Sequence, residues 1–274
     1  MICTLGDLLL DVIVRLEGPI AEDTDTYGRT RVGAGGQAAN VAAWVVALGG
    51  RARFLGKRAR DPAGRLLAEE LAGRGVELAG PEVESGTGTV VSVATPNGAR
   101  TMLSDRGVST EFAPEELEAA WLDGCEWLHV PGYSLVRSPL RETALAAAES
   151  VPRVSVDLSS TAAIEEYGVD SFRETLAELK PVVVFANEAE SDLVGILHTR
   201  TEVVKLGAKG AFVRNWSGGP TGVTDAATYP AAATGDVVDT TGAGDAFAAG
   251  FLLSGPDLAV EAAARCVAKM GAMP

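Results

Sequence analysis

The sequence is poor in aromatic and in basic residues. Aromatic residues make up 5% of its 274 residues, and 23 Lys and Arg stand against 37 Asp and Glu, for a net charge of −14. Nucleic acids and anionic membranes are bound by clustered basic side chains, so this charge argues against both as partners. Any phosphate that the protein handles must then meet backbone amides, helix ends or metal ions.

Cysteine is also scarce. Cys3, Cys125 and Cys266 are odd in number and widely spaced, mostly in apolar surroundings, and none has a zinc-like spacing. This pattern favours buried free thiols in a reducing compartment over disulfides. The N-terminus lacks a basic signal-peptide region, and the longest nearly apolar stretch, AANVAAWVVAL, is shorter than the about 20 residues of a membrane span. We therefore expect a cytoplasmic protein.

Short β-branched runs alternate with Ala-, Leu- and Glu-rich runs along most of the chain. This pattern predicts an α/β fold in three layers, a mostly parallel sheet with helices on both faces. The length favours one domain with an appendage over residues 1–274. The expected strands are 2–6, 52–56, 126–130, 153–158, 181–186 and 202–207. The expected helices are 35–50, 61–75, 113–124, 138–150 and 171–180.

Two segments, approximately residues 12–34 and 86–105, interrupt the alternation. The second has period-two apolar runs on both sides of the residues PNG, which indicates a β-hairpin. Together the two segments predict a small antiparallel sheet placed as a lid over a site. The exposed edges of such a sheet favour a homodimer formed through the lid.

The stretch DTTGAGDAFAAGF, residues 239–251, places an aspartate in the first turn of a glycine-rich helix. A helix that begins at Gly242 to Asp245 exposes its unpaired N–H groups to an anion. Asp245 would repel a phosphate unless it faced a neutral hydroxyl beside it. Phosphoryl transfer to an alcohol needs this pairing of a base with anion donors. The alternative is that Asp239 or Asp245 merely caps the helix.

A second glycine cluster, VGAGGQAAN, covers residues 32–40. On a helix Gly36 and Asn40 lie one turn apart, so Asn40 can point into a pocket floored by Gly35 and Gly36. The alternative is tight helix packing through small residues. The glycine spacing also fits the dinucleotide fingerprint, but no good core strand precedes it and no acidic residue ends the next strand. A nicotinamide dehydrogenase is therefore the weakest hypothesis.

Carboxylates also follow the first strand. In GDLLLD, Asp7 and Asp11 lie where open α/β sheets bind ligands, and a carboxylate there can accept hydroxyl hydrogen bonds. A surface turn is the alternative. Arg100 and Arg106 lie beside the lid and could meet an anionic substrate group, although a plain surface role is the simpler interpretation.

Two further motifs follow expected strands. In NEAE, Asn187 and Glu190 lie at a strand-to-helix junction, and Glu190 suits Mg²⁺, which takes one or two carboxylates with waters and phosphates; a helix cap is the alternative. In KLGAKG, Lys205 to Gly210 form a glycine loop suited to lie along a nucleotide, or a plain β-turn. His129 and His198 have no paired ligand spacing, so we expect neither to be catalytic.

The order of these motifs resembles that of the ribokinase-like (PfkB) carbohydrate kinase family over essentially the whole chain. The most specific matches are DTTGAGDAFAAGFL and GGQAANVA. The resemblance implies a Rossmann-like domain with a β-sheet lid, ATP as donor, and a hydroxyl of a sugar such as ribose, fructose or ketodeoxygluconate as acceptor. It implies that Asp245 is the catalytic base, with an anion hole formed by the amides of Gly242, Ala243 and Gly244.

The resemblance assigns the remaining site residues as well. The sugar would be held by Asp11, Gly35, Gly36 and Asn40. Asn187 and Glu190 would interact with Mg²⁺ and the phosphates. The nucleotide would be bordered by Lys205, Gly207, Gly210 and Gly244. A monovalent cation such as K⁺, found in some members, would be bound by Asp239 and Thr241.

The chain departs from the family in three places. The segment between NEAE and EVVKLG is short, and the sequence ends with RCVAKMGAMP. Lys205 stands where threonine is common in the family, although a lysine there resembles some ketodeoxygluconate kinases. Two alternatives stay open: a nucleoside kinase, which the few aromatics weakly disfavour because a base needs a stacking pocket, and a non-catalytic sugar- or nucleotide-binding protein with a degraded adenine site.

Overall fold

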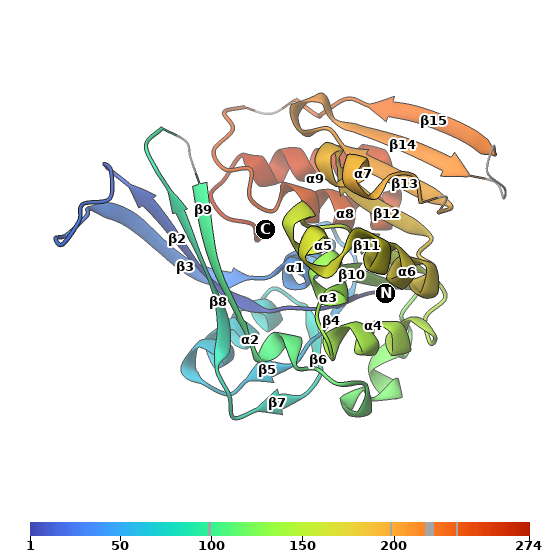
Figure 1. Cartoon of the computed structure of the whole chain (residues 1–274), viewed down its shortest axis with the longest axis horizontal. Coiled ribbons are helices and arrows are strands. Elements are labelled where there is room, and N and C mark those ends of the chain that lie inside the picture. The colour runs from blue at the N-terminus through green and yellow to red at the C-terminus, as the bar shows by residue number, and fades with distance from the viewer. Residues whose placement is uncertain (98–99, 198, 217–221, 234) are drawn as a thin grey trace.

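A nine-stranded sheet forms the centre of the protein in a computed structural model, which describes residues 1–97, 100–197, 199–216, 222–233 and 235–274 (Figure 1). Its strands, in spatial order, are β15 (Val223–Tyr229), β14 (Ala211–Trp216), β13 (Thr201–Lys205), β12 (Val183–Asn187), β11 (Val154–Asp157), β10 (Trp127–Pro131), β1 (Ile2–Leu5), β4 (Ala52–Leu55) and β6 (Glu77–Ala79). Neighbours from β13 to β6 pair in parallel, whereas β14 and β15 are antiparallel. The expected mostly parallel sheet is confirmed.

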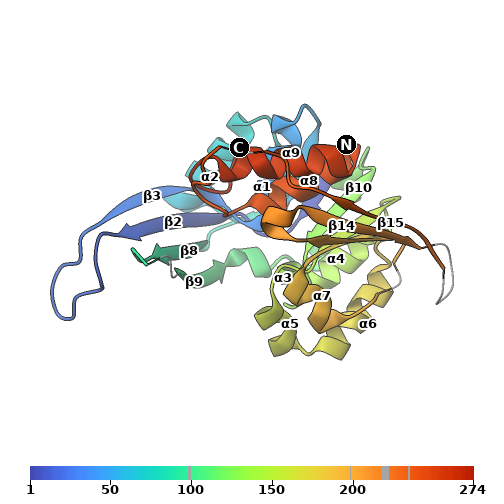
Figure 2. The same ribbon diagram turned by 90° about the horizontal axis from the view of Figure 1, so that it is seen from above.

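Helices cover both faces of this sheet (Figure 2). One layer holds α1 (Gln37–Ala47), α2 (Pro62–Gly73), α8 (Ala243–Ser254) and α9 (Pro256–Val267). The other holds α3 (Gly132–Leu135), α4 (Leu140–Ala148), α5 (Thr161–Tyr167), α6 (Val169–Leu179) and α7 (Glu188–Val194). Successive residues of β12 alternate between two cores, since Val183 and Phe185 join one while Val184 and Ala186 join the other. This alternation explains the continuous apolar run in the sequence.

A second sheet of four strands projects from the body (Figure 1). Its order is β3 (Gly28–Gly35), β2 (Leu9–Leu16), β8 (Thr87–Ala94) and β9 (Arg100–Gly107). The predicted β8–β9 hairpin is confirmed. The expectation of a purely antiparallel sheet is wrong, because β2 pairs with β8 in parallel. Two antiparallel hairpins lie side by side, and their first strands leave the body in the same direction.

The helix expected over residues 113–124 is also wrong. The segment forms two short 3-10 helices, η2 (Pro114–Glu116) and η3 (Ala119–Leu122), with extended backbone between them. Tertiary contacts override helix propensity here. Arg53 donates to the carbonyl of Trp121 at 2.7 Å, and Lys57 pairs with Glu116 at 2.7 Å.

The remaining short elements are β5 (Arg58–Ala59), β7 (Glu82–Val83), η1 (Val108–Thr110) and η4 (Gly207–Lys209). None of the helices in the described residues combines the length and the apolarity that a membrane crossing needs.

The expectation of three free thiols is wrong as well. Cys3 in β1 and Cys125 just before β10 form a disulfide, with their Cα atoms 5.8 Å apart, and Cys266 is free and buried. The two residues are 122 positions apart in the sequence, but β1 and β10 are neighbouring strands. That neighbourhood brings the two Cα atoms within the range that a disulfide spans.

Candidate active site

A cavity of about 860 Å³ lies between the second sheet and the carboxyl edge of the main sheet. It is lined by residues from β2, β8 and β9, from the ends of β1, β11, β12 and β13, and from the beginnings of α1 and α8. Carboxyl ends of parallel strands meet at one edge of a sheet, which is where ligands bind in open α/β folds. The second sheet is therefore placed over this edge as a lid.

Most of the predicted site residues meet in this cavity. Those that line it are Asp11, Gly36, Asn40, Asn187, Glu190, Lys205, Gly207, Gly210, Thr241, Gly242, Ala243, Gly244 and Asp245. Two predicted residues lie behind the wall. Gly35 supports Asp11, since a Cβ on Gly35 would lie 2.1 Å from the carboxylate carbon of Asp11. Asp239 accepts hydrogen bonds from Thr241 N at 3.0 Å, Thr241 Oγ1 at 2.6 Å and Gly271 N at 3.1 Å.

Helix α8 begins at the cavity without a side-chain cap. Its N-cap, Gly242, has a φ of 78°, which favours glycine, and a Cβ there would lie 2.5 Å from the Cα of Ala272. The hypothesis that Asp239 or Asp245 caps this helix is therefore wrong. The Ala243 N–H donates to the carbonyl of Thr240 at 3.3 Å. Its neighbours Gly242 and Gly244 also line the cavity, and no side chain caps this helix start, so their amides suit an anion-binding site.

Asp245 is buried in the first turn of α8, with 8% of the residue exposed. Its Oδ2 accepts a hydrogen bond of 2.8 Å from Nδ2 of Asn40 in α1. Burial raises the pKa of Asp245 to about 7, and the carboxylates of Asp157 and Asp7 act in the same direction, while Asn40 and Lys205 oppose the shift. A carboxylate with a pKa near neutrality is suited to exchange a proton with a hydroxyl.

Gly36, the N-cap of α1, brings Asn40 to this place. Its φ is 96°, and a Cβ there would lie 2.4 Å from the carbonyl oxygen of Asp7. The helix therefore starts directly against the chain that follows β1. The side chain of Asn40 is buried, and its Oδ1 has no hydrogen-bond partner within the described residues, so it can accept from a bound ligand.

Asp7, which follows β1, is buried rather than part of a surface turn. It forms an ion pair with Arg106 of β9, whose guanidinium carbon lies 4.1 Å from the ring centroid of Tyr133. Both Asp7 and Arg106 line the cavity, so the expected surface role of Arg106 is wrong. The side chain of Arg100 lies outside the described residues.

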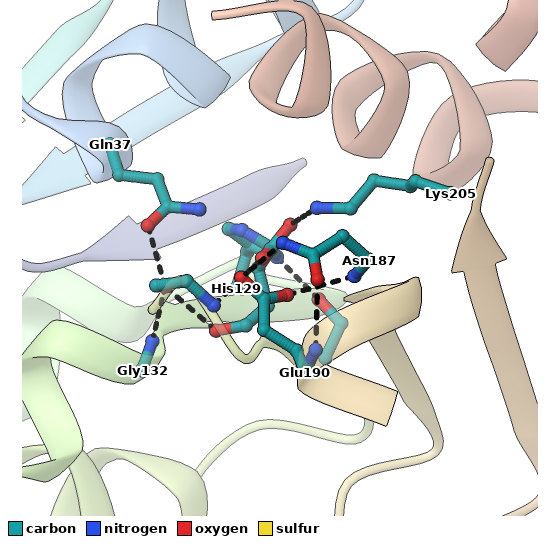
Figure 3. A network of polar contacts seen from close by, with 9 residues as sticks. Gln37, His129, Gly132, Asn187, Glu190 and Lys205 are labelled. Atoms are coloured by element: carbon teal, nitrogen blue, oxygen red, sulfur yellow. Dashed lines mark hydrogen bonds and ion pairs between the residues drawn. The ribbon is translucent and has the colours of Figure 1, made fainter. Parts of the chain in front are cut away.

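Asn187 and Glu190 form a capping box at the start of α7 (Figure 3). Glu190 accepts from N and Nδ2 of Asn187, and its own N–H donates to Oδ1 of Asn187, all at 2.8 Å. The predicted alternative of a helix cap is therefore present, although both residues also line the cavity. Burial and the nearby carboxylate of Asp157 raise the pKa of Glu190.

No sequence motif pointed to Asp157, which is central in the structure. Asp157 ends β11, is 1% exposed, and accepts a hydrogen bond of 2.5 Å from Nζ of Lys205 and one of 3.1 Å from Ser159 N. Ser159 Oγ accepts from Gly132 N at 2.9 Å and donates to Oε1 of Gln37 at 2.6 Å (Figure 3). The signal was available, because Asp157 follows a buried strand in RVSVDL as Asp7 does in CTLGD.

The loop after β13 contains the predicted glycines. Gly207 and Gly210 have φ values of 59° and 97°, and a Cβ on Gly210 would lie 1.9 Å from the carbonyl oxygen of Tyr229. The loop thus packs tightly onto β15 while lining the cavity.

One of the two histidines, His129, lies within the described residues. His129 is fully buried, its Nδ1 lies 2.9 Å from Ser155 Oγ, and burial lowers its pKa to about 4. It does not line the cavity, and His198 lies outside the described residues. No group of three or more His, Cys, Asp or Glu that could hold a metal ion occurs in the part of the chain that the structure describes.

The fold and the cavity define a lidded α/β phosphotransferase, in which a helix start offers anion donors beside a buried carboxylate. The chain belongs to the pfkB family of carbohydrate kinases, whose profile matches residues 1–273. It is an ATP-dependent sugar kinase. The hypothesis of a nicotinamide dehydrogenase is therefore wrong.

Similar proteins support the same class. An ATP-dependent ribose-1-phosphate kinase from Halopiger xanaduensis is 30% identical over 263 residues, which cover 92% of this chain and 83% of the relative. A fructokinase from Klebsiella pneumoniae is 30% identical over 268 residues, with shares of 92% and 83%. Among solved structures, adenosine kinase from Sinorhizobium meliloti superposes with a TM-score of 0.84 at 23% identity, covering 100% of this chain and 95% of that one. The last likeness shows the fold alone.

Proposed function

We propose that this cavity transfers the γ-phosphoryl group of ATP to a hydroxyl of a small carbohydrate, with Asp245 as the base. The observation that carries the proposal is the buried carboxylate of Asp245 in the uncapped first turn of α8. The hydroxyl oxygen bonds to the γ-phosphorus while the bond from that phosphorus to the bridging oxygen breaks. The proton passes to Asp245, and the electron pair of the broken bond stays on ADP. The amides of Gly242, Ala243 and Gly244 stabilise the charge on the phosphoryl group.

The two ends of the cavity suit the two substrates. The end at the lid offers Asp11, Gly36 and Asn40, whose oxygens can accept sugar hydroxyls, and Gly35 supports Asp11 from behind. The end at β13 offers the loop from Lys205 through Gly207 to Gly210 for the nucleotide. Ribose, fructose and ketodeoxygluconate are acceptors of the right class, and the relatives include a ribose-1-phosphate kinase and fructokinases.

A nucleoside kinase is the second candidate. The aromatic residues that line the cavity are Tyr133 and Phe247, and the guanidinium of Arg106 already covers the ring of Tyr133. The stacking surface left for a base is therefore small, which favours a sugar. A panel of sugars and nucleosides in the same assay separates the two.

Glu190 is the residue that we propose for Mg²⁺. It is buried in the cavity wall, and Asp157 lies near enough to raise its pKa, so this region has surplus negative charge. Mg²⁺ is commonly bound by one or two carboxylates, with waters and substrate phosphates as its other ligands. When bound here, it would neutralise phosphate charge. Glu190→Gln keeps a capping partner for Asn187 and should raise the Mg²⁺ concentration for half-maximal rate about tenfold.

We propose that Asp239 and Thr241 contribute to a site for a monovalent cation. Their mutual hydrogen bonds and the bond from Gly271 N bring oxygens together behind the start of α8. Replacing K⁺ by Na⁺ in the assay should lower the rate if a cation of that size organises this loop. Equal rates in both salts would count against the site.

We also propose a homodimer formed through the lid. One row across the sheet, Val32, Val12, Val91 and Leu103, lies on the face opposite to Asp11 and Val90, which line the cavity. Val32 is 53% and Leu103 58% exposed, so the row is an unpaired apolar surface. Leu103→Glu should shift the mass measured by light scattering from dimer to monomer. A wild-type monomer would refute this part.

The decisive experiment is a coupled ADP-release assay across sugars and nucleosides with Mg²⁺ and K⁺. Asp245→Asn should retain the fold and substrate binding and lose most turnover, because the hydroxyl loses its base. Asp257→Asn is the matched control, since Asp257 is an exposed acidic residue in the first turn of the next helix, α9. Near-normal turnover by Asp245→Asn would remove Asp245 as the base.

A further inference from the structure

The side chain of Lys205 lies between a buried carboxylate and the start of α8. Its Nζ is 2.5 Å from Oδ2 of Asp157 (Figure 3). A Cβ built on Gly244 would lie 3.2 Å from the same Nζ. The spatial order β13, β12, β11 means that Lys205 reaches across the end of β12 to Asp157. The ammonium therefore lies over the carboxyl edge of the sheet, beside the amides at the start of α8 that would donate hydrogen bonds to an anion.

The charges around this ammonium are negative. Asp157, Glu190 and Asp245 are all buried, and all three raise the pKa of Lys205, outweighing the burial that acts to lower it. Lys205 thus keeps its charge. Because like charges repel, a phosphoryl group that enters between these carboxylates needs a cation beside it. Lys205 supplies one at the place where the group must arrive.

A purely structural ion pair would explain this geometry less well. A buried pair contributes little net stability, because the cost of desolvating two charges offsets their attraction. Lys205 also faces the cavity, with 18% of its side chain exposed, instead of being enclosed in either core. A Cβ at position 244 would lie 3.2 Å from Nζ of Lys205, so a side chain there would push the ammonium a few tenths of an ångström away from the helix start.

We propose that Lys205 is a catalytic residue whose ammonium contacts the transferring phosphoryl group, and that Asp157 is the positioning residue that holds it there. This inference rests on the proposed phosphoryl transfer. As the P–O bond to ADP breaks and the bond to the sugar oxygen forms, the ammonium stabilises the charge on the three remaining phosphoryl oxygens. It gives up no proton, because the proton of the hydroxyl goes to Asp245.

Lys205→Met tests the contact. The rate constant kcat should fall about 10²- to 10³-fold, as on loss of one donor to a transition-state oxyanion, while Lys205→Arg retains part of the rate. The matched control is Lys57→Met, which also removes a mostly buried lysine–carboxylate pair, at 12% side-chain exposure, but lies outside the cavity. Lys57→Met should leave kcat unchanged.

Equilibrium binding gives a readout without turnover. In an Asp245→Asn background, Lys205→Met should weaken ATP binding at least tenfold more than ADP binding, because only ATP carries the phosphoryl group that Lys205 contacts. A structural role for Lys205 would weaken both nucleotides equally or neither.

The pH profile separates the roles of Lys205 and Asp157. The charged groups that face Asp245 are Asp7, Asp157 and Lys205; Lys205 lowers the pKa of Asp245, and the two carboxylates raise it. The acid limb of kcat/KM should therefore move to higher pH in Lys205→Met and to lower pH in Asp157→Asn. Asp157→Asn should also lower kcat, since its amide holds the ammonium less firmly.

The outcomes distinguish this inference from the function on which it rests. No ADP release by the wild-type protein with any sugar or nucleoside would refute the phosphoryl transfer itself. Wild-type turnover together with normal kcat and an unchanged ATP-to-ADP preference in Lys205→Met would refute only the role of Lys205. A fall in kcat of the same size in Lys57→Met would show a loss of stability and would also overturn the inference.

Discussion

The side-chain amide of Asn40 donates a hydrogen bond of 2.8 Å to Oδ2 of Asp245, across 205 residues of sequence. The bond joins the beginning of α1 to the first turn of α8. It favours the charged form of Asp245 and so opposes the burial that raises the pKa of this carboxyl. One contact thereby links the proposed sugar-binding helix to the proposed base.

Asn40→Ala should slow the enzyme more at neutral than at alkaline pH. Without the amide the pKa of Asp245 rises above about 7, so a smaller fraction of the base is ionised at pH 7. We expect kcat/KM to fall about 10²-fold at pH 7 and clearly less at pH 9. Equal losses at both pH values would mean that Asn40 acts only by holding the sugar.

Asp245→Asn should stabilise the fold, and more so at high pH. The ordinary pKa of 3.8 applies in the unfolded chain and a pKa of about 7 in the folded one, so ionisation of Asp245 disfavours the folded state increasingly from about pH 4 to pH 7. Asparagine has no charge to bury and can still accept from Asn40. The Tm of the variant should exceed that of the wild type by roughly 5–10 °C at pH 8 and little at pH 4. A pH-independent difference, measured by calorimetry, would contradict the raised pKa.

Gly35→Ala should weaken sugar binding selectively. The added Cβ would lie 2.1 Å from the carboxylate carbon of Asp11, so the carboxylate must move. We expect the KM for the sugar to rise about tenfold or more while the KM for ATP stays the same. Gly73→Ala is the control, because a Cβ at that helical position meets nothing within 4 Å.

Arg106→Met should lower the free energy of unfolding. The substitution leaves the buried carboxylate of Asp7 without its guanidinium, at a cost of about 2 kcal/mol after allowance for the partial exposure of Arg106. Arg153→Met is a matched control, since Arg153 also pairs with a carboxylate, Glu126, and covers a ring, that of Trp127 at 4.4 Å, but on the surface. Its cost in urea unfolding should stay below about 1 kcal/mol.

Thiol titration tests the Cys3–Cys125 disulfide. The denatured, unreduced protein should expose one thiol, that of Cys266, and three after reduction, since the structure pairs the other two cysteines. Three thiols without reductant would restore the sequence-based expectation.

The predictable part of the site comprises residues whose roles depend on local chain geometry. A glycine-rich helix start at Gly242 and the small residues before Asn40 are visible as short motifs, because helix ends and close backbone approaches require particular residues nearby. The capping box of Asn187 and Glu190 is equally local, with a spacing of three residues. Each of these features can be predicted without knowing the order of the strands in the sheet.

Other features escaped prediction because they depend on neighbours in space. The helix expected over residues 113–124 does not form, because Arg53 and Lys57, from a much earlier part of the sequence, contact this segment. Arg106 was expected at the surface but lies in the cavity, because the β8–β9 hairpin brings it against Asp7. Hydrophobic periodicity reports which face of an element is buried, but not against which partner.

The sequence by itself determined the alternation of strands and helices, the lid hairpin and the glycine turns, since these follow from the period of apolar residues and from backbone sterics. Only the tertiary structure decided that Asn40 meets Asp245, that Lys205 reaches Asp157 across β12, and that Cys3 meets Cys125. Each of these contacts depends on which strands become neighbours. That choice is made by the packing of the whole chain, and no local pattern encodes it.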